Sequence, residues 1–176
     1  MLAIELDQFN TEERGGLLTE DQGQDGYNIL EHLTLSDIDF QHYNEAVNHE
    51  HHRSVDDKCL LVMKQLRQMG HLEKEDIQID CLLHRICIQK NTLFAEKRLR
   101  FLVEWDPTAL SQYNDDYNIP LHHVASFSCI EGFQIVFEYG IRYYPKKNGI
   151  HLLFQKNARM TTHSTKWLVK HVDEMK

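Results

Sequence analysis

The sequence has only three prolines and four cysteines among its 176 residues, and it lacks several patterns that define whole classes of protein. No C-x-x-C pair and no Asn-x-Ser/Thr sequon occurs, so neither a disulfide framework nor a zinc ribbon is expected. The longest clean apolar run, residues 59–63, is far too short to span a membrane, and the first residues do not resemble a signal peptide. We therefore expect reduced thiols in an intracellular protein, in the cytoplasm, with the nucleus as the alternative.

Basic residues are fewer than acidic ones. The chain has 19 Lys and Arg but 27 Asp and Glu, which gives a formal net charge of -8. The pairs Lys97-Arg98 and Lys146-Lys147 are isolated, whereas binding to a phosphate backbone requires clustered cations. Nucleophile elbows of the G-x-S-x-G type and phosphate-binding glycine loops are missing as well. The sequence therefore predicts no nucleic-acid or membrane partner, no cofactor and no enzymatic activity.

The most informative segment that is present reads N-D-D-Y-N-I-P-L-H-H-V-A-S, at residues 114–126. Pro120 suits the first turn of a helix, because its missing N–H would be unpaired there anyway. His122 can bond to backbone in the neighbouring turn, and it is predicted to be structural. The pair Leu83-His84 recurs 38 positions later (121 − 83) as Leu121-His122, so the sequence predicts two successive helical units.

Apolar side chains at helical spacing predict further helices before and after these units. Ser36 and Ser54 are predicted to begin two helices, Gly70 to end the second in a left-handed conformation, and Gly140 to end the outer helix of the later unit. The expected organisation is a flexible acidic segment at 1–35, N-terminal helices acting as a cap at 36–70, repeats at 71–156, and a C-terminal loop with a capping helix at 157–176.

The stretch from about residue 80 to residue 154 resembles divergent members of the ankyrin-repeat family. The matching patterns are L-L-H-R-x-C at 82–87, W-D-P-x-A-L at 105–110, N-D-x-x-x-P-L-H-H-x-A-S at 114–126 and F-x-x-V-F-E-x-G-I at 133–141. Tyr117 departs from the family, since it stands where ankyrin turns carry glycine. The resemblance implies an all-α fold: a helical solenoid of ankyrin-like helix-turn-helix repeats with capping helices.

The resemblance also implies a non-catalytic protein-interaction module that uses turn tips and the concave face of the inner helices. The acidic tips indicate that the partner is another protein of basic or mixed charge. The candidate partner-binding residues are Gln78, Ile79, Asp80, Arg85, Ile88, Asp115, Asp116, Tyr117, Asn118, His123 and Ser126.

Two alternatives remain open at this point. The twelve histidines allow a metal-dependent or small-molecule-binding enzyme around His42, His49 and His52, although their spacing matches no known metal-binding pattern. The missing repeat opening after Lys156 allows a decayed or truncated paralogue without an independent function.

Overall fold

The computed structural model describes residues 26–35, 49–88, 94–127, 130–144, 151–152 and 155. Its elements are α1 (Ile29–His32), α2 (His49–Gln68), α3 (Lys74–Ile79), α4 (Leu82–Cys87), α5 (Glu96–Trp105), the 3-10 helix η3 (Pro107–Ser111), α6 (Pro120–Phe127) and α7 (Ile130–Tyr143). All of these elements are helices, which confirms the predicted all-α class for the described part of the chain.

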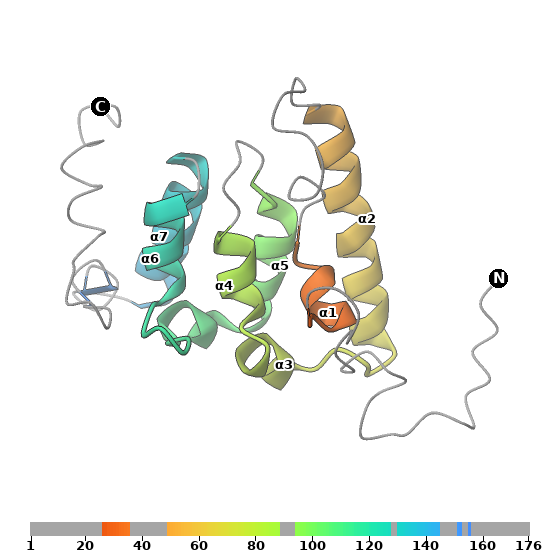
Figure 1. Cartoon of the computed structure of the whole chain (residues 1–176), viewed down its shortest axis with the longest axis horizontal. Helices are drawn as coiled ribbons and strands as arrows, with labels where there is room; N and C mark the ends of the chain where they lie inside the picture. Colours follow the sequence, from red (N-terminus) through yellow and green to blue (C-terminus); the bar gives the residue numbers. More distant parts are fainter. Residues whose placement is uncertain are drawn as a thin grey trace.

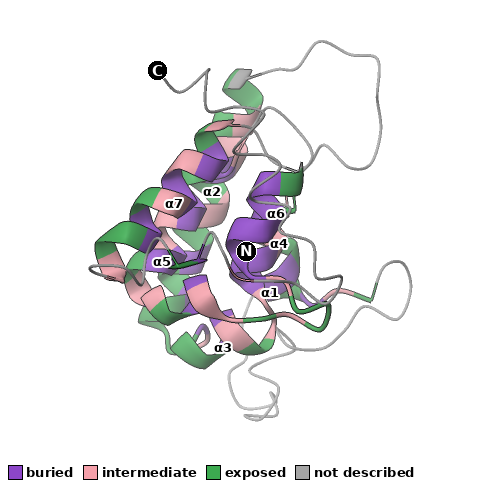
Figure 2. Cartoon of the chain, turned by 90° about the vertical axis from the view of Figure 1, so that its left-hand side faces the viewer, coloured by how far each residue is buried: buried purple, intermediate pink, exposed green. Residues whose placement is uncertain are grey.

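The helices lie in two columns, with α1, α4 and α6 in one and α2, α5 and α7 in the other (Figure 2). Helix α4 packs against α5 and helix α6 against α7, while α4 contacts α6 and α5 contacts both α2 and α7. The pairs α1/α2, α4/α5 and α6/α7 follow one another along the long axis of the molecule (Figure 1), and we call them the first, second and third layers.

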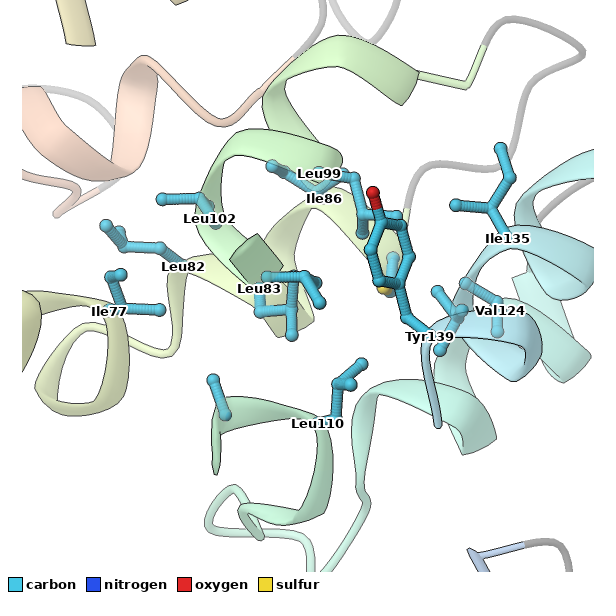
Figure 3. Packing of buried hydrophobic residues seen from close by; sticks show 14 of the residues in the cluster. Ile77, Leu82, Leu83, Ile86, Leu99, Leu102, Leu110, Val124, Ile135 and Tyr139 are labelled. Atoms are coloured by element: carbon cyan, nitrogen blue, oxygen red, sulfur yellow. The ribbon is translucent and has the colours of Figure 1, made fainter. Parts of the chain in front are cut away.

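Apolar side chains from all three layers form one continuous core. Leu83 of α4 and Leu121 of α6 belong to it and are 0% and 1% exposed. Figure 3 shows Leu83 and Ile86 of α4 together with Leu99 and Leu102 of α5. Because burying one such side chain contributes about 1.5–3 kcal/mol, this cluster is the main attraction between the layers.

Helix α2 ends as predicted but begins earlier. Gly70 has a φ of +73°, its N–H donates to the carbonyl of Arg67 at 3.1 Å, and the N–H of His71 donates to that of Leu66 at 2.8 Å. This is a Schellman cap, in which glycine has no steric penalty. The helix begins at His49, so the predicted start at Ser54 is wrong. Glu50 in the first turn favours the earlier start through the helix dipole.

Residues 26–35 correct the prediction that residues 1–35 form one flexible segment. The Asn28 side chain accepts the N–H of Glu31 at 2.9 Å, and the Glu31 carboxylate accepts the N–H of Asn28 at 2.7 Å, so the two residues form a capping box that begins α1. Leu30 is 1% exposed and Thr34 is 0% exposed. Residues 1–25, the helix predicted after Ser36 and the segment predicted at 157–176 lie outside the described residues.

The buried guanidinium of Arg98 in α5 joins three parts of the chain. Its Nε donates to Oδ1 of Asp56 in α2 at 2.8 Å, and its Nη1 donates to the carbonyls of Leu33 and Leu35 at 2.7 and 2.9 Å. Arg98 is 1% exposed, so the attraction between its charge and the Asp56 carboxylate is little screened by water. The end of α1 is thereby fixed to both α2 and α5.

Helix α7 continues past Gly140 to Tyr143, so the prediction that Gly140 ends this helix is wrong. The φ of Gly140 is not in the left-handed region. A Cβ at this position would lie 3.0 Å from Cδ1 of Leu152, so the glycine allows that side chain to approach the helix closely. The short helices α3 and η3, which precede the inner helices α4 and α6, are additions that the sequence did not predict.

Candidate functional site

Seven of the eleven predicted binding residues lie just before α4 or α6, either at the end of α3 or in the turn that precedes each of these two helices. Within the described part of the chain these turns contain the two non-glycine residues with positive φ, Cys81 at +49° and Tyr117 at +55°. Such a conformation costs an ordinary residue about 1–2 kcal/mol. Tyr117 therefore adopts the backbone for which ankyrin turns use glycine.

Gln78, near the end of α3, joins that helix to the segment around η3. Its Nε2 donates to Oδ2 of Asp106 at 2.6 Å and to Oγ1 of Thr108 at 2.9 Å, and its carbonyl accepts Nε2 of Gln112 at 2.8 Å. Burial would raise the pKa of Asp106, but hydrogen bonds from Gln78, Thr108 and Lys74 hold that pKa below its ordinary value. Gln78 is thus a structural residue, and the prediction that it contacts a partner is not supported by this geometry.

Arg85 was predicted to lie on the free inner face of α4, but the N-terminal segment occupies its side chain. Its Nη2 pairs with the Glu31 carboxylate, its Nε donates to the carbonyl of Asp80 at 3.3 Å, and its guanidinium carbon lies 4.4 Å from the ring centroid of Tyr27. Both polar and cation–π contacts hold it in place. Arg85 therefore binds α1 to α4, and its contact with a partner stays a prediction.

Asp80 lies half-buried beside this ion pair. Burial raises the pKa of its carboxyl group, and the neighbouring carboxylates of Glu31 and Asp76 raise it further, against the hydrogen bond from Asn28 and the charge of Arg85. Its Oδ2 is buried without a hydrogen-bond partner. Asp80 is therefore a weaker candidate for a partner contact than a fully exposed carboxylate.

The turn before α6 is built around Asn114. Its Oδ1 accepts the N–H groups of Asp116 and Asn118 at 3.1 and 2.9 Å, and its carbonyl accepts the N–H of Tyr117 at 2.9 Å. The turn is rigid because one side chain satisfies several backbone donors. Asp115, Asp116 and Tyr117 consequently project outwards, and Tyr117 is 63% exposed.

His123 was predicted to face the concave surface, but it is buried and only 6% exposed. Its ring lies edge-on to that of His84, with centroids 5.6 Å apart. The oxygen of the Asn114 amide already accepts two N–H groups, so its Nδ2 donates to Nε2 of His123 at 3.1 Å. Burial, together with His84 and His122, lowers the pKa of His123 to about 4.

His84 and His122 both connect one layer to the chain that follows. Nε2 of His84 donates to the carbonyls of Gln112 at 3.1 Å and Asn118 at 3.0 Å, and Nε2 of His122 donates to that of Gln155 at 2.9 Å. The N–H of Ile119 donates to Nδ1 of His122 at 3.1 Å. These bonds agree with the prediction that both residues are structural.

Three of the predicted contact residues outside the second turn are exposed. Ile79 is 77% exposed and Ile88 is 39% exposed, and Ser126 is exposed near the end of α6. A hollow of about 310 Å³ lies beside Ile79 and is lined by Lys74, Glu75, Gln78 and Ile79. The residue that sequence reasoning missed is Tyr113, which is 45% exposed and lies close to Tyr117. Its position four residues before Tyr117 was the available signal.

Two kinds of chemistry can be considered for the described residues, metal binding and attack by a thiol. These residues contain no group of three or more histidine, cysteine or acidic side chains that could hold a metal ion, while His42 lies outside them. Burial raises the pKa of the Cys81 and Cys87 thiols, so neither is activated as a nucleophile at neutral pH.

Comparison with known proteins finds no match among family models, curated proteins or solved structures. Among the described helices, none combines the length and the apolar character that crossing a bilayer requires. The function is therefore inferred from the chain itself.

Proposed function

We propose that the chain is a non-catalytic protein-interaction module, built on a divergent ankyrin-like solenoid of three layers. The bonds of the layer histidines support this architecture, because the acceptor carbonyl follows His84 by 34 residues and follows His122 by 33. An ankyrin unit has about 33 residues, so each histidine bonds to the chain about one unit length further on, although His84 and His122 are themselves 38 residues apart. In this proposal α1 and α2 supply the additional layer that two recognisable repeats need for stability.

The observation that supports the binding role most strongly is the exposed and strained Tyr117. Its φ of +55° lowers stability, and its ring, being 63% exposed, contributes little to the core. Strain of this kind persists where function requires it, and tyrosine is enriched among the residues that dominate protein interfaces. We therefore assign Tyr117 to the contact surface, together with Asp115 and Asp116.

The experiment compares full-length baits for the proteins that they capture from native lysate, quantified by mass spectrometry. Tyr117→Gly should leave the melting temperature unchanged or higher, since relief of the left-handed strain exceeds the entropy cost of glycine by about 0.5–1 kcal/mol. The same substitution, and Asp115→Lys with Asp116→Lys, should abolish capture of the specific partners.

Glu131→Lys with Glu138→Lys is the matched control, because it makes the same change in net charge on exposed positions of α7. This control bait should capture the same proteins as the wild type. If all four baits capture one common set of proteins, the turn is not the contact surface and the proposal is wrong.

A further inference from the structure

The turn before α6 lies in a long stretch of sequence without a lysine or an arginine, and Arg142 in the last turn of α7 is the first cation that follows it. No lysine or arginine occurs from residue 101 to residue 141, whereas six carboxylates do: Glu104, Asp106, Asp115, Asp116, Glu131 and Glu138. Only the buried Asp106 has a cation from elsewhere among its described contacts, since Lys74 Nζ lies 3.3 Å from its Oδ1. The two exposed carboxylates in this turn, Asp115 and Asp116, therefore have no cation nearby in sequence, which favours cationic partners and repels anionic ones.

The turn before α6 adds two aromatic faces to these two carboxylates. The ring centroids of Tyr113 and Tyr117 are 6.4 Å apart, with their planes inclined by 52°. A cation can therefore lie within about 6 Å of both centroids at once, which is the range of cation–π attraction. Both rings are accessible, since Tyr113 is 45% and Tyr117 is 63% exposed.

The two exposed carboxylates lie between these tyrosines in the sequence. Asp115 and Asp116 are the central residues of the turn that Asn114 closes, and the N–H of Asn114 donates to the carbonyl of Asn118 at 3.0 Å. A rigid turn of this kind loses little conformational entropy when it binds a partner, and a smaller entropy loss gives a higher affinity. Arg85 of the preceding layer is already engaged by Glu31 and Tyr27.

We infer that this turn binds a cationic side chain, an arginine or a lysine, presented by a basic segment of the partner protein. The cation lies against the open sides of Tyr113 and Tyr117, and the carboxylates of Asp115 and Asp116 balance its charge. An acidic partner would be repelled, and a purely apolar one would leave both carboxylates unpaired. This inference rests on the proposed function, because it names the chemistry of the partner at the same surface.

The experiment is an NMR titration of the full-length chain with a six-residue peptide of alternating glycine and arginine, followed through backbone amide shifts at 0.15 M salt. The same peptide with neutral citrulline in place of arginine is the matched probe. The arginine peptide should shift the amides of residues 113–117, and the citrulline peptide should not. Tyr113→Leu should weaken binding roughly two- to five-fold, whereas Tyr113→Phe, which keeps the aromatic face, should not.

Asp115→Asn with Asp116→Asn should also weaken binding of the arginine peptide, while Glu131→Gln with Glu138→Gln, of equal charge change, should weaken it much less. Equal binding of the two peptides, or equal losses in the two carboxylate variants, would overturn the inference. The proposed function is tested separately: if lysate capture still depends on Tyr117 while the arginine peptide fails to bind at the turn, only the cationic chemistry is wrong. If capture does not depend on the turn, both proposals are wrong.

Discussion

The buried pair His84 and His123 should make the fold sensitive to mild acid. In the unfolded chain a histidine takes up a proton near pH 6.5, whereas burial lowers the pKa of His123 to about 4 and also lowers that of His84. A group with a depressed folded-state pKa of this kind favours the folded state fully above pH 6.5. That contribution is lost as the pH falls towards the folded-state pKa.

For His123 the magnitude follows from the two pKa values. A fall from 6.5 to about 4 corresponds to a loss of roughly 2 kcal/mol of unfolding free energy at pH 5 and about 3 kcal/mol at pH 4. His84 acts in the same direction. The raised pKa of Asp80 acts in the opposite direction, and the depressed pKa of Asp106 matters only in more acidic solution, below the ordinary range of an aspartate.

The assay is urea unfolding followed by circular dichroism at 222 nm, at several values between pH 7.5 and pH 5. His123→Gln removes the titrating group while its side-chain oxygen can still accept the Asn114 Nδ2–H. Between pH 7.5 and pH 5 the unfolding free energy of this variant should fall by roughly 2 kcal/mol less than that of the wild type. The matched control is His151→Gln at an exposed position. If the wild type and His123→Gln lose the same free energy, the reasoning about the buried ring is wrong.

Three further predictions concern the first layer and its contacts. Arg98→Met should lower the unfolding free energy by about 3–5 kcal/mol in chemical denaturation, because it leaves the charge of Asp56 buried without its partner. Gly70→Ala should lower the unfolding free energy by about 1 kcal/mol, because alanine is strained at a positive φ, even though nothing lies within 4 Å of the added Cβ. An unchanged melting temperature would contradict the assigned cap. Deleting residues 49–70 should abolish cooperative thermal unfolding, and a sharp melt of the deleted chain would show that α2 is dispensable.

Several helix boundaries were predictable because local chemistry determines where a helix begins or ends. Pro120 is the first residue of α6 as expected, and Trp105 is the last residue of α5, because Asp106 precedes a proline and is pushed out of helical geometry. Gly70 ends α2 for an equally local reason. In each case the signal lies within a few residues of the structure that it predicts.

Helix α1 was missed because its stability comes from distant residues. The Asn28-x-x-Glu31 capping box was visible in the sequence, but only Leu30 in this four-residue helix is a buried apolar side chain. The contacts that order it come from Arg85 and Arg98, which lie more than fifty residues later in the chain. Such pairings cannot be read from spacing alone.

The candidate surface was partly predictable for a similar reason. The turn with Asp115, Asp116 and Tyr117 follows from the local motif, and these residues are exposed. His123 was placed wrongly, because the residue next to an inward-facing His122 was expected to face outwards, whereas both side chains are buried. Tyr113 was missed because its relation to Tyr117 depends on the closure of the turn.

The position of Arg98 in the chain bears on how a nascent polypeptide can fold. Its guanidinium binds the carbonyls of Leu33 and Leu35, which precede it by 65 and 63 residues. Because synthesis proceeds from the N-terminus, α1 reaches solution well before the residue that fixes its end has left the ribosome. The N-terminal layer is therefore completed late during translation, after the segment that it covers has been made.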